Sequence, residues 1–180
     1  GVRYADHALG RFIREARTHA WFGDTLFVIV ADHDARVYGK ADIPLNNYEI
    51  PLLFYAPGHL ASGTVATPTS QIDVPPTVLG LLGLPYEAPF FGQDVRHWPA
   101  GVPRTLLFNH NHDVGALRGD SFCILGLQKS ARCEHYTRTP GPPGAATTQL
   151  SAAADDPALI ELATAYYQIA YEQFQQHRYR

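Results

Sequence analysis

Residues Phe27–Arg36 read FVIVADHDAR, an apolar run that leads directly into an acid and a histidine. Together with Leu26, the run has no polar residue before Asp32, which is typical of a strand covered on both faces in a parallel sheet. A second run, PLLFYA at Pro51–Ala56, follows a polar loop and is closed by Pro57-Gly58. The two runs predict an α/β fold with a mainly parallel sheet.

Helical periodicity occurs before and after these runs. Between Arg3 and Ala20, apolar residues recur at helical spacing and charged residues fill the opposite face, which predicts an amphipathic helix. Asp73 stands at the N-cap position of the segment DVPPTVLGLLG, whose prolines suit a first helical turn and which Gly83 would end. A last helix is predicted from Asp156-Pro157. Its apolar residues at helical spacing are interpreted as packing residues: Leu159, Leu162, Tyr166, Tyr167, Ile169, Ala170, Tyr171 and Phe174.

Short β-rich segments follow Gly92. RTLLFNH, DVGALRG, SFCILG and CEHYTR are separated by turn residues, most clearly at Arg118–Ser121, and predict an antiparallel meander. Thr139–Ala146 is a loop by composition. Cys123 and Cys133 match no zinc motif, so we expect two buried thiols, with a single hairpin disulfide as the alternative.

Bulk composition narrows the class of protein. A length of 180 residues, 46% of them hydrophobic and 17% charged, predicts one soluble globular domain. The net charge of -3 and the lack of a Lys/Arg cluster give nucleic-acid binding no support. No apolar run approaches the roughly 20 residues that cross a bilayer, and the amino end does not match a signal peptide.

The pair Asp32-His33 is the main candidate for chemistry. It lies at the carboxyl end of the predicted strand, where open α/β sheets gather ligands. A carboxylate oxygen beside an imidazole nitrogen suits a divalent metal such as Mn, Ca, Mg or Zn, provided that the backbone leaves the strand here. The alternative is a capping Asp beside a histidine hydrogen-bonded to the loop. Asp6-His7, in contrast, falls within a predicted helix, where adjacent side chains diverge by about 100°.

Four ordered blocks carry a resemblance to a known family. They are YADHALGRFIREARTHAWFGDTLFVIVADH, YEIPLLFYAPG, SQIDVPPTVLGLLG and FFGQDV. They resemble the carboxy-terminal half of the sulfatase-type catalytic domain of the alkaline-phosphatase superfamily, and most nearly its branch of lipoteichoic acid synthases and phosphoglycerol transferases. The likeness covers about Val2–Val95 and extends loosely into the later strands.

The resemblance implies an architecture. It implies part of an alkaline-phosphatase-like α/β sandwich with a mainly parallel sheet, followed by a small antiparallel meander and a carboxy-terminal helix. Residues 1–180 would form one domain, itself the carboxy-terminal portion of a larger catalytic domain. Within it, residues 1–100 would be the α/β part, 101–138 the β-rich part and 155–180 the helix.

The resemblance also implies a chemistry. Asp32 and His33 match metal ligands of the family. Arg36 and Lys40 are candidates for binding the substrate's phosphate or sulfate group, with solvated loop charges as the alternative. In that family a Thr, Ser or formylglycine nucleophile attacks a phosphate or sulfate ester with the help of a divalent metal. The nucleophile would lie upstream of residue 1, so we expect a fragment that is inactive alone and that associates through an uncovered apolar face.

Partners and location follow from the same resemblance. The substrate would be a phosphate or sulfate ester, lipid- or glycan-linked in some members. The full-length protein would be anchored in the cytoplasmic membrane by helices that this chain lacks, with its catalytic domain outside. A non-catalytic binding module that keeps only the fold is the alternative function. His110 and His112, two apart on a predicted strand, are a further metal candidate, interpreted more simply as strand-end polar residues.

Overall fold

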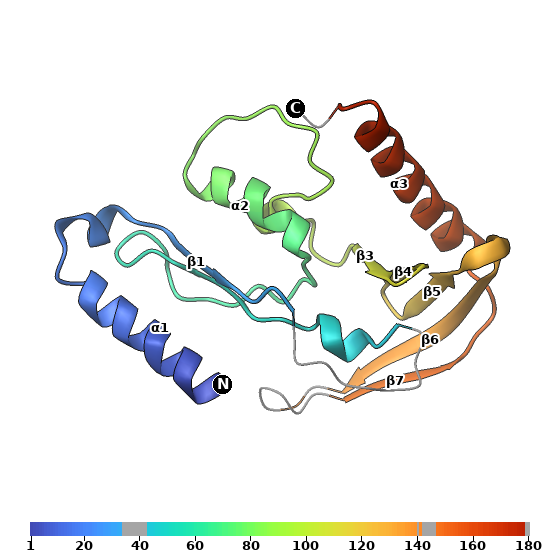
Figure 1. Cartoon of the computed structure of the whole chain (residues 1–180), viewed down its shortest axis with the longest axis horizontal. Helices are drawn as coiled ribbons and strands as arrows, with labels where there is room; N and C mark the ends of the chain where they lie inside the picture. The colour runs from blue at the N-terminus through green and yellow to red at the C-terminus, as the bar shows by residue number, and fades with distance from the viewer. Residues whose placement is uncertain (34–42, 140, 142–146, 179–180) are drawn as a thin grey trace. The chain divides into compact units, whose positions relative to one another are not determined.

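Figure 1 presents the computed structural model of the chain, which describes residues 1–33, 43–139, 141 and 147–178. The described residues form two compact units, one from residues 1–33 and 46–64 and the other from residues 43–45 and from 65 onward. The first unit contains a two-stranded sheet and the second a five-stranded sheet. The predicted α/β fold with an antiparallel meander and a carboxy-terminal helix is confirmed. None of the helices in the described part of the chain is long and apolar enough to cross a membrane.

The first unit begins with helix α1, Val2–Ala16. On its exposed side Arg11 donates to Glu15 at 2.8 Å, one turn further on. The helix ends before the predicted Ala20, because the Thr18 hydroxyl bonds back to the Glu15 carbonyl at 2.8 Å and so competes with the helical ladder. A 3-10 helix, η1 (Ala20–Asp24), then leads into strand β1, Phe27–Val30.

An aromatic cluster holds this unit together. The ring of Phe27 lies 6.2 Å from Phe12 of α1, 5.3 Å from Phe22 of η1 and 6.0 Å from Tyr55 of strand β2, Leu52–Tyr55. Arg17, just after α1, donates to the Tyr55 hydroxyl at 3.2 Å. Helix and sheet are therefore fixed to each other at the Phe27 end of β1.

The direction of the strands corrects one prediction. β1 and β2 pair antiparallel, with Phe27 opposite Tyr55 and Val30 opposite Leu52, so the predicted parallel pairing is not confirmed. The described part of their connection contains a 3-10 helix, η2 (Leu45–Tyr48). Val30 and Leu53 are 40% and 54% exposed, so the apolar runs are less covered than their composition predicted.

The second unit starts with a 3-10 turn, η3 (Gln71–Asp73), followed by helix α2, Val74–Leu81. Gly83 ends α2 as predicted: its φ is +65°, its N–H donates to the Gly80 carbonyl, and the Leu84 N–H donates to the Leu79 carbonyl. These two bonds form a Schellman motif, which satisfies carbonyl groups that the helix leaves unpaired.

Asp73 is structural, but not in the way predicted. It stands at the N-cap position of α2 without capping that helix through its side chain. Instead its buried carboxylate accepts from the N–H groups of Ser70 and Gln93, and Arg104 donates to both oxygens at 2.7 Å. The Arg104 guanidinium also lies 4.8 Å from the Trp98 ring centroid. The side chains of this ion pair are 6% and 0% exposed, so Asp73 is a fully bonded buried charge.

Gly92 explains the fourth sequence block, FFGQDV, in packing terms. A Cβ at this position would collide with the backbone carbonyl of Ile72, which is not free to move aside. The Gly92 backbone therefore lies directly against η3, and this closeness lets Gln93 donate to Asp73 at 2.9 Å. Two residues on, the Val95 N–H donates to the buried Thr77 hydroxyl at 3.2 Å.

The meander has the strand order β3-β4-β5-β6-β7, antiparallel throughout. Its strands are Thr105–His110, Asp113–Arg118, Ser121–Leu125, Ala131–Thr139 and Thr147–Ala152. A short 3-10 helix, η4 (Val95–His97), precedes it, and another, η5 (Leu127–Lys129), joins β5 to β6. Strand β7 was not predicted, because its sequence TTQLSA is largely polar and mostly lies on the surface.

Helix α3, Pro157–Gln175, packs on the meander through β4 and β5 (Figure 1). It starts at Pro157 as predicted, and its capping residue is Asp156, which accepts from the Leu159 N–H at 3.0 Å. A core cluster between the meander and α3 consists of Ala116, Cys123, Cys133, Leu159 and Ala163, all at most 5% exposed. Cys123 and Cys133 form a disulfide, so the expected pair of free thiols is wrong and the alternative holds. The two residues stand opposite each other on β5 and β6, a register that sequence spacing could not fix.

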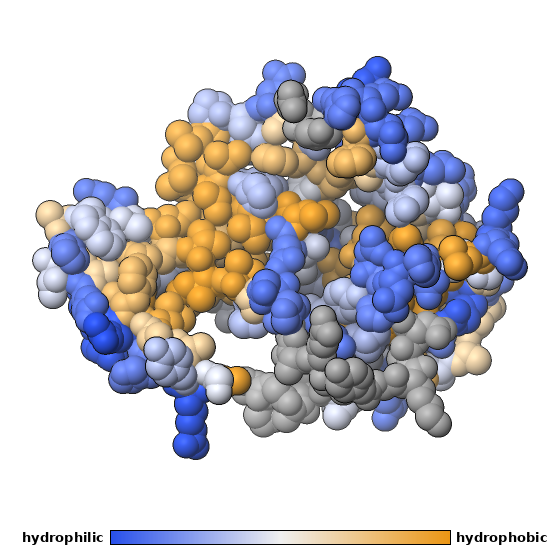
Figure 2. All heavy atoms as spheres, viewed as in Figure 1, coloured by the Kyte–Doolittle hydropathy of each residue, from blue (hydrophilic) through white to orange (hydrophobic). Residues whose placement is uncertain are grey.

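The predicted packing stripe of α3 holds only near its start. Leu159 is buried and the Tyr166 ring lies 5.9 Å from Phe91, whereas Tyr167, Tyr171 and Phe174 are 55%, 57% and 65% exposed. Figure 2 shows apolar and polar side chains interspersed on one face of the molecule. Helical spacing alone does not tell which turns of a helix lie over its sheet.

Candidate metal site

The candidate site lies where β1 ends. After Val30, one more backbone bond, from the Ala31 N–H to the Pro51 carbonyl at 3.3 Å, continues the pairing with the second strand. At Asp32 the chain bends away from the ladder. Joint coordination by Asp32 and His33 required the backbone to leave the strand at this point, and it does. In a continuing strand the two side chains would point to opposite faces.

The two side chains turn toward each other. The Asp32 Oδ1 accepts from the His33 backbone N–H at 2.9 Å, and the Asp32 Oδ2 lies 3.5 Å from His33 Nε2. The His33 and Asp32 side chains are 71% and 87% exposed. The bond through Oδ1 orients the carboxylate and leaves the Oδ2 edge beside the imidazole.

This separation fits two ligands of one cation. Ligand atoms held about 2.1 Å from a metal at the tetrahedral angle lie about 3.4 Å apart. The 3.5 Å between Oδ2 and Nε2 is close to that span. A carboxylate oxygen and an imidazole nitrogen are also an accepted donor set for Zn or Mn. The pair therefore fits a divalent cation, although protein metal sites use three or four ligands and these residues supply two.

The other Asp-His dipeptide provides an internal comparison. Asp6 and His7 lie in the middle of α1, both exposed, and no ion pair joins them in the structure's described residues. Adjacent positions of a helix point about 100° apart. The same two residue types are therefore brought together at the end of β1 and held apart in α1, and this difference comes from the backbone.

Several sequence candidates do not add to the site. Arg36 and Lys40, the candidates for binding substrate, lie outside the described residues. Among residues that the structure does describe, no group of three or more His, Cys, Asp and Glu side chains is placed to hold a metal. The second metal candidate is not supported: His110 ends β3 but His112 lies in the following turn, so the two do not share a strand face. Asn111, with φ of 56°, makes that turn.

Sequence reasoning missed Arg104, the buried charge that pairs with Asp73. The available signal was indirect: an acid inside an apolar segment, DVPPTVLGLLG, requires a cation once it is buried. Which of the arginines supplies that cation depends on a contact across 31 positions, which no local pattern shows. Asp73 and Arg104 satisfy each other and form a structural pair.

Comparisons with known proteins agree with this fold. The sulfatase family model matches residues 1–84, the segment that contains α1, β1, β2 and the Asp32-His33 pair. A choline-sulfatase of Rhizobium meliloti is 29% identical over 113 residues, which cover 60% of this chain and 21% of that protein. The lipoteichoic acid synthase-like protein YvgJ of Bacillus subtilis is 29% identical over 111 residues, covering 52% of this chain and 18% of that protein.

A solved structure extends the likeness to the whole chain. A protein of the alkaline phosphatase superfamily from Vibrio parahaemolyticus superimposes with a TM-score of 0.85 and 27% sequence identity, over 99% of this chain and 42% of that chain. The likeness therefore includes the meander and α3, beyond the residues that the family model matches. The chain spans about a fifth of the length of the curated relatives it matches.

These findings confirm the resemblance seen in the four sequence blocks. The fold is similar to that of the alkaline phosphatase superfamily protein, and the candidate site is an acid-histidine pair at the end of a strand. The amino-terminal 84 residues match the sulfatase family model, so this segment is similar to the sulfatase domain.

Proposed function

We propose that this chain supplies the Asp32-His33 part of a divalent metal site in a sulfatase-type enzyme that hydrolyses or transfers a phosphate or sulfate ester. The observation that carries the proposal is the 3.5 Å approach of Asp32 Oδ2 to His33 Nε2 at the end of β1. The comparison with Asp6-His7 supports it, because that dipeptide has the same composition without the same approach.

The role of each residue follows from its chemistry. Asp32 contributes a hard anionic oxygen, which its Oδ1 bond to the His33 N–H holds in place, and His33 contributes Nε2. Together the two residues would hold a divalent cation, Mn or alternatively Ca, Mg or Zn, whose chemistry there would be to polarise the ester oxygens and stabilise the charge that develops on them. Arg36 and Lys40 are proposed to bind the phosphate or sulfate group as a fork and a point charge.

The remaining parts of the reaction are proposed by likeness to the family. A Thr, Ser or formylglycine nucleophile would come from sequence outside residues 1–180, so the chain alone would have no activity. The substrate would be an ester on a lipid, a glycan or a small alcohol, as the two curated relatives differ in this respect by name. An extracytoplasmic location, with a membrane anchor outside this chain, belongs to the same proposal.

Activity of the full-length protein tests the proposal. Asp32→Asn and His33→Gln should each lower kcat/KM for aryl sulfate or aryl phosphate esters by about a hundredfold or more, because each removes a ligand of a metal that acts on the transition state. Asp6→Asn and His7→Gln, made in the matched dipeptide of α1, should leave the rate unchanged. Full activity in the Asp32 and His33 variants would instead favour a non-catalytic module that keeps only the fold.

A further inference from the structure

The disulfide of the second unit lies at the point where the meander meets α3. Cys123 of β5 and Cys133 of β6 stand opposite each other, and they are 0% and 5% exposed. Both belong to the core cluster that also contains Leu159 and Ala163 of α3. The disulfide is therefore buried beneath α3 and forms part of the sheet face on which the helix packs.

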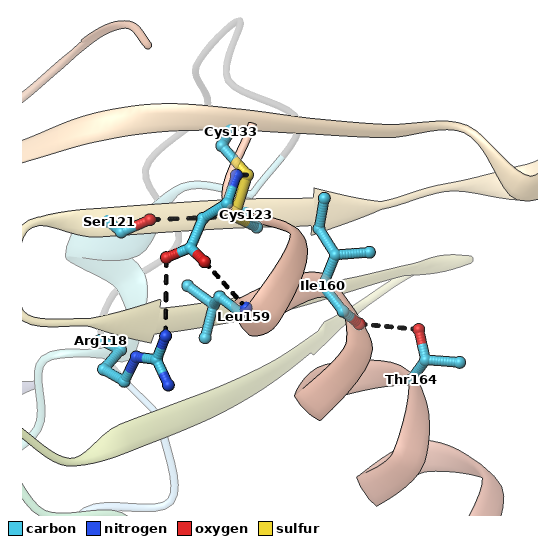
Figure 3. The surroundings of a disulfide bond; sticks show 8 residues. Arg118, Ser121, Cys123, Cys133, Leu159, Ile160 and Thr164 are labelled. Atoms are coloured by element: carbon cyan, nitrogen blue, oxygen red, sulfur yellow. Dashed lines mark hydrogen bonds and ion pairs between the residues drawn. A yellow bond between two sulfur atoms is a disulfide. The ribbon is translucent and has the colours of Figure 1, made fainter. Parts of the chain in front are cut away.

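A hydrogen bond connects the disulfide to the start of α3. The Asp156 backbone N–H donates to the Cys133 Sγ at 3.2 Å, and the Asp156 carboxylate caps α3 by accepting from the Leu159 N–H at 3.0 Å. The same carboxylate lies 3.6 Å from the Arg118 guanidinium at the end of β4. Figure 3 shows these interactions converging beside the sulfur atoms. One residue thus joins the disulfide, the meander and the first turn of the helix.

We propose that the disulfide between Cys123 and Cys133 is formed by oxidation outside the reducing cytosol, and that it locks α3 onto the meander. The reaction converts two thiols into one S–S bond. A disulfide donor accepts the two electrons: its own S–S bond breaks and its two sulfur atoms take up the two protons. This inference concerns the second unit and does not depend on the proposed metal site.

Packing explains why the helix depends on the bond. Two unbonded thiols need more room than one disulfide, and the space around the sulfur atoms is filled by Ala116, Leu159 and Ala163. Reduction would therefore push against the first turns of α3 and disturb the Cys133 sulfur that accepts from Asp156. In addition, the bond closes a loop of sequence separation 10 and restricts the unfolded chain.

Burial makes the bond a permanent staple. Thiol–disulfide exchange requires a thiolate to reach a sulfur atom, and neither cysteine is accessible in the folded unit. The disulfide must therefore form during folding, in a compartment where disulfides persist. Once α3 is docked, mild reductants should not open it.

Thiol counting tests the modification. The 180-residue chain, produced in an oxidising compartment, is treated with iodoacetamide and weighed by mass spectrometry. We expect no added label in the native chain, none after denaturation, none when a mild reductant is added to the native chain, and two labels after denaturation with reductant. Label on the chain that was denatured without reductant would overturn the proposal, and label after mild reduction of the native chain would show an accessible switch instead of a staple.

Stability and hydrogen exchange test the lock. Reduction of the unfolded chain followed by refolding should lower the folded-to-unfolded ratio of the second unit by about a hundredfold. It should also speed amide exchange in α3 while leaving β1 and β2 unchanged. The double variant Cys123→Ala/Cys133→Ala, which has no bond to lose, should not respond to reductant. Complete unfolding of the reduced second unit would also support the proposal, as the largest destabilisation possible. An unchanged unfolding midpoint of that unit, or unchanged amide exchange in α3, would overturn the proposal.

Discussion

Removal of the Arg104 side chain tests how the second unit is held together. Arg104→Met keeps much of the volume and deletes both 2.7 Å bonds to Asp73. The carboxylate would keep the Ser70 and Gln93 N–H groups but would have no counter-charge, in a site where its side chain is 0% exposed. Breaking one side of such a buried pair costs about 3–5 kcal/mol of the free energy of unfolding.

The two tryptophans allow the measurement to be confined to this unit. Trp21 lies in the first unit, and Trp98 stacks on the Arg104 guanidinium in the second. In a Trp21→Phe background, the Trp98 fluorescence therefore reports unfolding of the second unit alone. For a urea dependence of about 1–3 kcal/mol per M, Arg104→Met should lower the midpoint by at least about 1 M.

Arg96→Met is the matched control. Arg96 also pairs with an acid, Asp94, at 2.6 Å, but its own side chain is 36% exposed. Exposed or half-exposed pairs contribute up to about 1 kcal/mol, so this variant should shift the midpoint little. The double variant Asp73→Asn/Arg104→Met should cost less than the sum of the two single changes, because no uncompensated charge remains. Equal costs for Arg104→Met and Arg96→Met would refute the interpretation of a buried pair.

Two further predictions concern the same unit. Gly92→Ala should destabilise it by about 1–3 kcal/mol, since the new methyl group would meet the Ile72 backbone. The control Gly63→Ala, in the first unit and with nothing within 4 Å of its Cβ, should be nearly neutral in urea unfolding. Hydrogen bonding from the Leu159 N–H, the largest cause, holds the pKa of Asp156 below its ordinary value of 3.8. This contribution to stability is therefore present above about pH 4 and is lost as the pH falls through the lowered pKa. Asp156→Ala should cost about 1 kcal/mol near pH 7 and less at pH 2–3, and a cost independent of pH would contradict this.

Local patterns predicted the parts of the fold that depend on local forces. Periodicity located α1 and α3, the prolines after Asp73 located α2, and Gly83 and Gly119, with φ of +65° and +63°, mark turns that their sequence predicted. In these elements the hydrogen bonds run between near neighbours. A sequence window of a few turns therefore contains the information that decides them.

The features that sequence did not predict depend on distant contacts. Strand β7 exists because it pairs with β6, and its own composition is typical of a loop. The Cys123–Cys133 bond required the β5–β6 register, and the direction of β2 required knowledge of its pairing with β1. Each case depends on the relative placement of two segments, which apolar composition restricts but does not determine.

The candidate site was predicted only in part. A strand end followed by Asp32-His33 indicated where ligands would gather, and the family resemblance indicated a metal. The approach of the two side chains depends on a bond from the His33 N–H to Asp32 Oδ1, which requires the backbone to bend at that residue. That bend is a property of the loop and is not visible in the residue types. The roles of Arg36 and Lys40 stay predictions.

The metal content of the full-length protein tests the central claim most directly. Protein purified after exposure to Mn²⁺ and removal of free metal would be measured by inductively coupled plasma mass spectrometry, beside Asp32→Asn/His33→Gln and the control Asp6→Asn/His7→Gln. We predict that the wild type and the control retain the same bound divalent metal and that the Asp32/His33 variant loses most of it. Equal metal in all three proteins, each folded by circular dichroism, would contradict the assignment of this pair as ligands.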